Sequence, residues 1–392
     1  MRITDIQATV VAVPFRHEER WAFGVRRGMV SVLLEVHTDE GIVGIGEAPA
    51  YPTADIVLAV VGSLRSLVVG EDPVRIERIV KRIEAIGTWH HVRGSSPAIG
   101  GVEMACWDIV GKVAGLPVCD LLGGRVRDEV EYFRYLGRGP ADAVAEEARA
   151  AVARGFGTLY LKVGWGDPAD DVALIAAVRE AIGPGAGIRV DANESWSSGT
   201  AIRVLRELEP YGLESAEQPI SGRNLSEMAY VRGRIGMPLL ANEATWSRHD
   251  VLQTVAANAA DMISVDNLMD GGLLNMKRAA GIAEAAGIGV LKHSLGELGV
   301  ATCAAAHVIA STPNFLYANQ GYQALLADDV LVGGGIAAAE GSTLTVPDAP
   351  GIGVELDRDK VATYAEQYRT HGHEMAFTAP SEATATPTIP RR

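Results

Sequence analysis

Residues 158–193 read TLYLKVGWGDPADDVALIAAVREAIGPGAGIRVDAN. A short apolar run (158–164) is followed by a helical stretch (171–183) and then by a second apolar run (187–193). A strand, a helix and a second strand in this order are typical of a parallel sheet. The first run contains Lys162, and a buried ammonium is costly unless it is paired, loses its proton or does chemistry. The alternative is a lysine whose charged end reaches solvent from the end of the strand.

The same alternation continues along the chain. Eight short β-like runs are separated by amphipathic helical stretches, and they read EYFRYLG, TLYLKVG, GIRVDAN, LESAEQP, PLLANE, MISVDN, GVLKHS and FLYANQ. Eight strands alternating with helices over about 190 residues predict an α/β fold, a parallel (β/α)₈ barrel of the TIM type. A doubly wound open sheet is the alternative, but it predicts a glycine-rich phosphate loop after its first strand, and none is evident.

The segments on either side of the barrel predict a second unit. Residues 1–50 read as a β-meander with a hairpin turn at 39–41, and residues 53–115 have helical periodicity. The predicted organisation is an α+β capping domain at 1–125, the barrel at 126–325, a C-terminal return packing on the capping domain at 326–375, and a disordered tail at 376–392.

The composition excludes several classes of partner. The chain has 392 residues, is 48% hydrophobic and carries a formal net charge of −14, which argues against nucleic acid and anionic membranes as partners. The sequence contains no apolar stretch of membrane-spanning length and no recognisable signal peptide. The three cysteines are scattered, as reduced thiols are in a cytoplasm. We therefore expect a cytoplasmic enzyme acting on a small molecule.

Polar residues recur where the predicted strands end. At intervals of 24 to 29 residues these are Lys162, Asp191, Glu217, Asn242 or Glu243, Asp266 and His293. Because the C-terminal ends of barrel strands converge on one mouth, we expect these side chains to meet there. One such residue alone is more often a solvated loop charge, but six in step with the repeat indicate a site.

Asp191, Glu217 and the LLANEA segment (239–244) end three consecutive strands. Their oxygen ligands favour Mg²⁺, and the lack of a thiol or histidine in this arc makes zinc the weaker choice. Asn242 and Glu243 are neighbours, so on a strand only one of them can point inward. The spacing favours Asn242 and the charge favours Glu243, and both stay candidates for the third ligand.

Lys162 lies on one side of the predicted metal site, and Asp266 and His293 lie on the other. An Asp–His pair is a general acid/base unit, in which the carboxylate orients the imidazole. We expect a bound cation to depress the pKa of Lys162 into a useful range. Two bases across a metal suit abstraction of the proton α to a carboxylate, with the metal stabilising the enediolate as it forms.

With these residues the chain resembles the enolase superfamily, and most closely the mandelate racemase-like subgroup of the mandelate racemase / muconate lactonizing enzyme family. The resemblance covers nearly the whole chain. It implies that Lys162 is a base, that Asp266 and His293 form the opposing dyad, and that the chain is a homo-oligomer. Muconate-cycloisomerase-like members carry a lysine where Asp266 stands. The implied metal ligands are Asp191, Glu217 and one of Asn242 and Glu243.

Two departures from the family pattern affect the predicted substrate site. Tyr160 replaces the first lysine of the K-x-K element that ends in Lys162. The eighth strand also lacks the glutamate that relatives use to bind the substrate carboxylate. The candidate substrate-binding residues are Asn319, Gln320 and Glu297 in its place, Tyr160 and Asn193 beside the base, and Arg20 and Trp21 in a predicted mobile lid (14–29).

The resemblance implies a Mg²⁺-dependent enzyme that dehydrates a sugar acid to a 2-keto-3-deoxy acid. Racemisation, epimerisation or cycloisomerisation of another carboxylate is the alternative. Two other classes fit the same barrel. One is a Schiff-base aldolase with Lys162 as its nucleophile, which would not need metal ligands on three strands. The other is a barrel that binds a sugar acid without turning it over.

Overall fold

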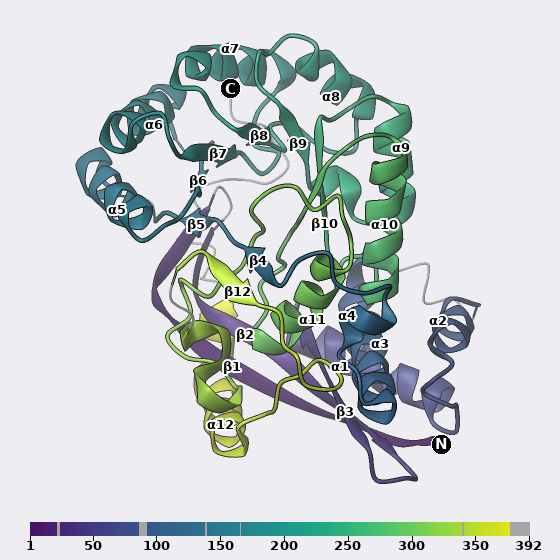
Figure 1. Ribbon diagram of the computed structural model, residues 1–392. Helices are drawn as coiled ribbons and strands as arrows, with labels where there is room; N and C mark the ends of the chain where they lie inside the picture. Colours follow the sequence, from purple (N-terminus) through teal and green to yellow (C-terminus); the bar gives the residue numbers. More distant parts are fainter. Residues whose placement is uncertain (22–23, 86–91, 138, 165, 339–340, 377–392) are drawn as a thin grey trace.

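The computed structural model describes residues 1–392 except 22–23, 86–91, 138, 165, 339–340 and 377–392 (Figure 1). The chain begins with an antiparallel sheet in the order β1 (Ile3–Trp21), β2 (Gly24–Thr38) and β3 (Val43–Pro49). The turn between β2 and β3 contains Gly41 at a φ of 80°, where glycine avoids steric strain. The predicted hairpin at 39–41 is therefore confirmed.

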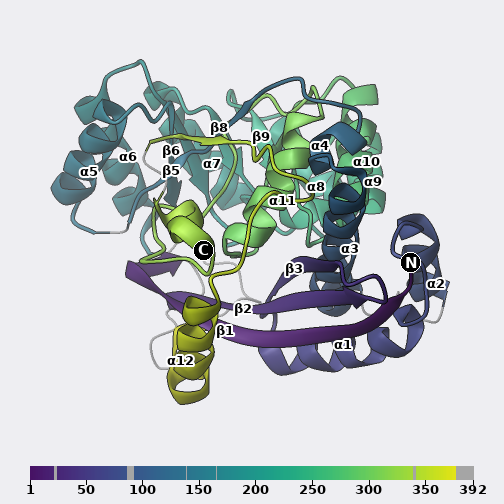
Figure 2. The ribbon, with the colours of Figure 1, turned by 60° about the horizontal axis from the view of Figure 1, so that its bottom comes forward.

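Helices cover one face of this sheet. They are α1 (Ala54–Val68), α2 (Ile76–Ala85) and α3 (Val92–Ala114), followed by the short α4 (Val118–Leu121). A Cβ atom at Gly46 would lie 2.0 Å from the carbonyl oxygen of Gly101. Glycine at this position of β3 therefore allows α3 to approach the sheet closely. Figure 2 shows α1 on one side of β1 and β2 and the barrel on the other.

The barrel contains a seven-stranded parallel sheet. Its strands in spatial order are β5 (Arg134–Tyr135), β6 (Thr158–Lys162), β7 (Gly187–Asp191), β8 (Ser215–Glu217), β9 (Leu239–Ala241), β10 (Met262–Val265) and β11 (Val290–Lys292). The eighth predicted strand forms only single bridges, from Phe315 to Val290 and from Asn319 to Tyr132. These bridges link the two edges of the sheet, so the predicted (β/α)₈ barrel with an N-terminal capping domain is confirmed.

Helices surround the strands on the outside of the barrel (Figure 1). They are α5 (Ala141–Ala153), α6 (Pro168–Ile182), α7 (Ser198–Leu208), α8 (Leu225–Arg232), α9 (Arg248–Ala256), α10 (Leu273–Ala285) and α11 (Gly299–Ala310), with the 3₁₀ segment η2 (Glu209–Tyr211) after α7. Several begin with a side-chain cap; Asp167, for example, accepts a hydrogen bond from the backbone N–H of Ala169 at 2.9 Å. The sequence therefore specifies where individual helices begin as well as the alternation of strands and helices.

The pairing of neighbouring strands places three polar residues in one row. Lys162 at the end of β6 is level with Asp191 at the end of β7, and Asp191 is level with Glu217 at the end of β8. Because these residues are level with one another and stand at the ends of adjacent strands, their side chains lie at the same edge of the sheet. The regular spacing of these residues in the sequence therefore corresponds to a row of charged side chains at the mouth of the barrel.

Two carboxylates from the capping domain bind the starts of barrel helices. Glu47 of β3 accepts hydrogen bonds from two backbone N–H groups at the start of α11, at 2.6 and 3.0 Å. Glu103 of α3 does the same at the start of α10, at 2.8 and 3.1 Å. Burial raises the pKa of each carboxyl group to about 7 despite these bonds. Helix N-termini favour negative charge, so these contacts hold the two domains together.

The C-terminal segment returns to both domains. After the 3₁₀ segment η4 (Val332–Ala338), β12 (Thr343–Thr345) pairs antiparallel with β4 (Glu129–Glu131) at the barrel. Helix α12 (Arg358–Ala376) packs on β1 and β2 (Figure 2). Within the described part of the chain, no helix is both long and apolar enough to cross a membrane.

We expect Glu103→Ala to lower the free energy of unfolding by about 2–4 kcal/mol, because it leaves two buried N–H groups of α10 without an acceptor. Urea denaturation measures the change. Glu180→Ala is the matched control, since this glutamate is exposed on α6. Equal stability of the two variants would contradict the role assigned to Glu103.

Candidate active site

Lys162 is buried at the end of β6 and has three polar partners. Its Nζ donates to Asp191 Oδ2 at 2.5 Å, to Asn193 Oδ1 at 2.8 Å and to the Tyr160 hydroxyl at 3.1 Å. Burial lowers the pKa of Lys162, but the charges of Asp191 and Glu217 outweigh it and raise that pKa overall. The protein's own groups therefore favour the charged lysine, and the depression of this pKa expected from a bound cation stays a prediction.

The carboxyl groups of Asp191 and Glu217 at the strand ends lie beside Lys162, together with that of Glu243, which follows the end of β9. Burial and the charge of Asp191 raise the pKa of Glu243 to about 8 and that of Glu217 well above its usual value. Glu243 Oε1 accepts a hydrogen bond from Asn193 Nδ2 at 3.0 Å. Its buried Oε2 has no hydrogen-bond partner among the described residues. Mutual repulsion and an unpartnered oxygen fit a site for a hard cation.

The side chains of these residues must move before they can hold a cation. Among the residues that the structure describes, no three His, Cys, Asp or Glu side chains stand in a cluster ready to hold a metal ion. The Lys162 ammonium instead contacts Asp191 directly. A cation would therefore draw the carboxylates together and compete with the lysine for Asp191.

Asn242 and Glu243 both line the same cavity. The expectation that only one of them points inward is wrong because β9 ends at Ala241, and Glu243 already begins the 3₁₀ helix η3 (Glu243–Thr245). The alternation of a strand no longer applies there. Asn242 Nδ2 donates to Glu217 Oε1 at 2.9 Å, and its Oδ1 accepts from Ser264 Oγ at 3.1 Å.

The predicted Asp–His pair is formed. Asp266 directly follows β10 and His293 directly follows β11, and His293 Nδ1 lies 3.0 Å from Asp266 Oδ2. The other oxygen of Asp266 accepts backbone N–H groups of Leu268 and Met269 at 2.5 and 3.1 Å. Burial raises the pKa of Asp266, but the hydrogen bond and charge of His293, the charge of Lys292 and the Leu268 N–H together outweigh burial and lower that pKa. With Nδ1 bound, Nε2 is the nitrogen that His293 can offer to a substrate.

These groups share a cavity of about 120 Å³ at the barrel mouth. It is lined by Glu19, Arg26, Tyr51, Lys162, Asn193, Asn242, Glu243, Trp246, Met269, His293, Ser294, Leu295, Gln320 and Tyr322. Residues 19, 26 and 51 come from the capping domain, and the others come from the barrel. Lys162 and His293 therefore face one space that both domains enclose.

Only one of the three candidates for the strand-8 position reaches this cavity. Gln320 lines it, and its Oε1 accepts the Ser294 backbone N–H at 3.2 Å. Glu297 is instead fully buried in an ion pair with Lys292. Asn319 binds backbone groups of Lys292 and Glu131. The structure thus places Glu297 and Asn319 outside the cavity because their polar atoms hold neighbouring segments together.

The stretch predicted as a lid reaches the barrel mouth, where Glu19 and Arg26 line the cavity. Most of residues 14–29 belong to the β1–β2 hairpin, in which Arg20 pairs with Val25 and Trp21 pairs with Gly24. The mobility of this stretch stays a prediction. The side chains of Arg20 and Trp21 lie outside the described part of the structure.

Glu19, Arg26 and Tyr322 line the cavity but were not singled out from the sequence as site residues. The Glu19 carboxylate accepts a hydrogen bond from the Tyr322 hydroxyl at 3.0 Å and lies 3.4 Å from Arg26 Nε. The Arg26 guanidinium also lies over the Tyr322 ring, 5.7 Å from its centroid. Glu19 and Arg26 are cross-strand partners in the hairpin, so strand pairing was the signal that could have found them.

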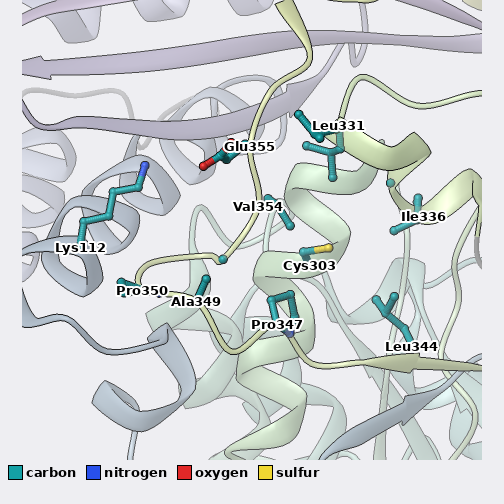
Figure 3. A pocket seen from close by; sticks show the side chains of 13 residues that line it. Lys112, Cys303, Leu331, Ile336, Leu344, Pro347, Ala349, Pro350, Val354 and Glu355 are labelled. Atoms are coloured by element: carbon teal, nitrogen blue, oxygen red, sulfur yellow. The ribbon is translucent and has the colours of Figure 1, made fainter.

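A larger cavity of about 610 Å³ lies among α3, α11 and the C-terminal return (Figure 3). Its walls are mainly apolar. Lys112 at its edge is bound to Asp108 and to the Val43 carbonyl, and burial raises the pKa of the Cys303 thiol to about 12. These groups offer neither a reactive nucleophile nor an acid–base pair. The cavity at the barrel mouth is therefore the candidate active site.

Two family models match the chain. The model of the mandelate racemase / muconate lactonizing enzyme N-terminal domain matches residues 5–123, and the enolase C-terminal domain-like model matches residues 143–360. Chloromuconate cycloisomerase of Cupriavidus pinatubonensis is 33% identical over 91% of this chain and 96% of its own. A probable glucarate dehydratase of Streptomyces coelicolor is 31% identical over 92% of each. The solved structure of a Thermobispora bispora enolase complexed with magnesium and formate has a TM-score of 0.86 and 31% identity, covering 96% of this chain and 95% of its own.

We expect the unfolding free energy of the metal-free protein to fall as pH rises from about 5 to 8.5. The folded-state pKa of Glu243, about 8, lies above its usual value, so its contribution to stability is complete below the unfolded pKa and is lost as pH rises through the folded pKa. Glu243→Gln should reduce this fall by about 1 kcal/mol or more in chelator-treated protein. Urea denaturation at several pH values measures it, with exposed Glu180→Gln as control. Parallel pH profiles for wild type and Glu243→Gln would contradict the assignment.

Proposed function

Because the chain belongs to the mandelate racemase / muconate lactonizing enzyme family of the enolase superfamily, we propose that it abstracts the proton α to a carboxylate. One observation carries this proposal: Lys162 and His293, whose ring Asp266 holds, line a single cavity beside the Asp191, Glu217 and Glu243 carboxyl groups. A substrate held between the two bases would expose its α-carbon to both.

The metal of this site is proposed to be Mg²⁺. Asp191, Glu217 and one of Asn242 and Glu243 would hold it, since their oxygens are the ligands that this ion prefers. The unpartnered Oε2 of Glu243 and the like-charge repulsion at the site support this assignment. When bound, the ion would hold the substrate carboxylate and stabilise the negative charge that develops when the α-proton leaves.

The favoured reaction is dehydration of a sugar acid to a 2-keto-3-deoxy acid. Lys162 would accept the α-proton. His293, oriented by Asp266, would donate a proton from Nε2 to the departing β-hydroxyl group, so that water leaves. The electron pair of the broken α-C–H bond forms the double bond between the α- and β-carbons as the C–O bond breaks. The resulting enol becomes the 2-keto-3-deoxy acid when its hydroxyl loses a proton and its β-carbon takes one up. The similarity to a probable glucarate dehydratase supports this choice.

The polar residues around Glu19 in the cavity also favour a polyhydroxy acid as the substrate. Glu19 is almost fully buried, and Arg26 and Tyr322 lie beside it. A carboxylate and a guanidinium can accept from and donate to substrate hydroxyl groups, whereas a wholly apolar substrate would displace water from them without replacing its hydrogen bonds.

Racemisation, epimerisation or cycloisomerisation of another carboxylate is the second candidate. It is favoured by the presence of two different bases on one cavity, since His293 could return a proton to the face opposite Lys162. The similarity to chloromuconate cycloisomerase supports the isomerase class. In either case we propose a cytoplasmic homo-oligomer that acts on a small carboxylate, without nucleic acid or membrane as partner.

Proton NMR in D₂O with Mg²⁺ and a panel of aldonic and aldaric acids tests the reaction. We expect loss of the α-proton signal together with formation of a 2-keto-3-deoxy product. Lys162→Ala should slow this by about 1,000-fold or more, while the fold and metal affinity persist, because a catalytic base is lost. Exposed Lys81→Ala on α2 is the control. Exchange without loss of water would select the isomerase alternative, and no exchange with any carboxylate, including N-modified amino acids, would refute the proposal.

Glu19→Gln tests the class of substrate. We expect KM for the sugar acid to rise about tenfold with a smaller change in kcat, because a charge-assisted hydrogen bond to a hydroxyl group is replaced by a neutral one. Steady-state kinetics on the sugar acid and on a deoxygenated analogue provide the measurement. An equal effect on both compounds would exclude Glu19 as a hydroxyl acceptor.

A further inference from the structure

Tyr160 lies beneath the cavity and is not one of the residues that line it. It precedes Lys162 by two residues on β6, so both side chains point to the same side of the strand. Its side chain is fully buried. The expectation that Tyr160 binds substrate therefore does not match its position, and its hydroxyl group needs another explanation.

The Tyr160 hydroxyl joins two residues of the proposed machinery. It donates to Asp191 Oδ2 at 2.5 Å and accepts from Lys162 Nζ at 3.1 Å. A hydroxyl has one donor and two acceptor positions, so one oxygen can serve both partners at once. The base and the carboxylate are thereby linked through a neutral group.

Aromatic packing fixes where this hydroxyl lies. The Tyr160 ring stacks on Phe133, with centroids 4.4 Å apart and planes 11° apart, and it contacts Tyr135 at 5.5 Å. Stacked rings in a dense core have few alternative positions. The location of the oxygen is therefore set by the barrel interior and not by the site itself.

Lys162 depends on such a fixed partner. An ammonium has three N–H groups, and those of Lys162 go to Asp191, Asn193 and Tyr160. Asp191 is a proposed metal ligand. Asn193 lies in a turn at a φ of 43° and also donates to Glu243. Tyr160 is the partner of Lys162 that is held by ring stacking.

We propose that Tyr160 is a positioning residue whose hydroxyl holds Lys162 Nζ and the Asp191 carboxylate in a fixed relation, so that the lysine faces the substrate α-carbon. This inference rests on the proposed function. Removal of the hydroxyl would free a long side chain to take other rotamers, and a displacement of about 1 Å at a reacting group costs about 100-fold in rate.

Tyr160→Phe removes the oxygen and keeps the ring. Two further variants allow proton exchange on each face of the substrate to be measured separately. Exchange that persists in His293→Asn is due to Lys162. Exchange that persists in Lys162→Ala is due to His293. We expect Tyr160→Phe to lower kcat on the Lys162 face about 100-fold, with KM changed less than about threefold. The His293 face should change little, whereas a general loss of structure would slow both faces equally.

Tyr132→Phe is the matched control. Tyr132 is also fully buried in the barrel, but its hydroxyl has no hydrogen-bond partner among the described residues. Loss of this oxygen should leave both exchange rates at the wild-type value. Equal losses in the two tyrosine variants would overturn the specific role of Tyr160.

Crystal structures of wild type and Tyr160→Phe give a readout that does not depend on turnover. We expect Lys162 Nζ to leave its wild-type position or to occupy several positions in the variant. An unmoved Nζ would overturn the inference, even if the wild-type enzyme exchanged no proton with any carboxylate, N-modified amino acids included. That last result alone would refute the proposed function, so the two failures are distinguishable.

Discussion

The parallel pairing of β6, β7 and β8 is the constraint on which the candidate site depends. It places Lys162, Asp191 and Glu217 level with one another at the strand ends. Burial and the charge of Asp191 raise the pKa of Glu217, and Lys162 offsets only part of this effect. Backbone hydrogen bonds fix this concentration of negative charge beside a base, and the fold must be rigid to maintain it.

The capping domain contributes to that rigidity and completes the cavity. Glu47 and Glu103 bind the N-termini of α11 and α10, so the sheet and α3 are held against the barrel by buried polar contacts as well as by apolar packing. The same domain contributes Glu19 and Arg26 to the cavity. Docking of the domains and shaping of the substrate site therefore depend on one arrangement.

The side chains that face the cavity are held in position by other buried residues. Aromatic packing in the barrel interior fixes Tyr160, and hydrogen bonds from backbone N–H groups fix Asp266. These two residues in turn contact Lys162 and His293, the side chains that face the cavity. Groups proposed to transfer protons are thus held by neighbours that are themselves immobile, which limits the reorganisation a reaction would require.

The sequence by itself determined the repeat, the barrel and the set of polar strand ends, because the alternation of strands and helices and the position of a residue within a strand are local properties. It also located the Asp266–His293 pair. Only the tertiary structure decided that Asn242 and Glu243 both reach the cavity, that Glu297 pairs with Lys292, and that Glu19 and Arg26 enclose the mouth. Those outcomes depend on where a strand stops and on contacts between residues far apart in the chain, which local periodicity does not encode.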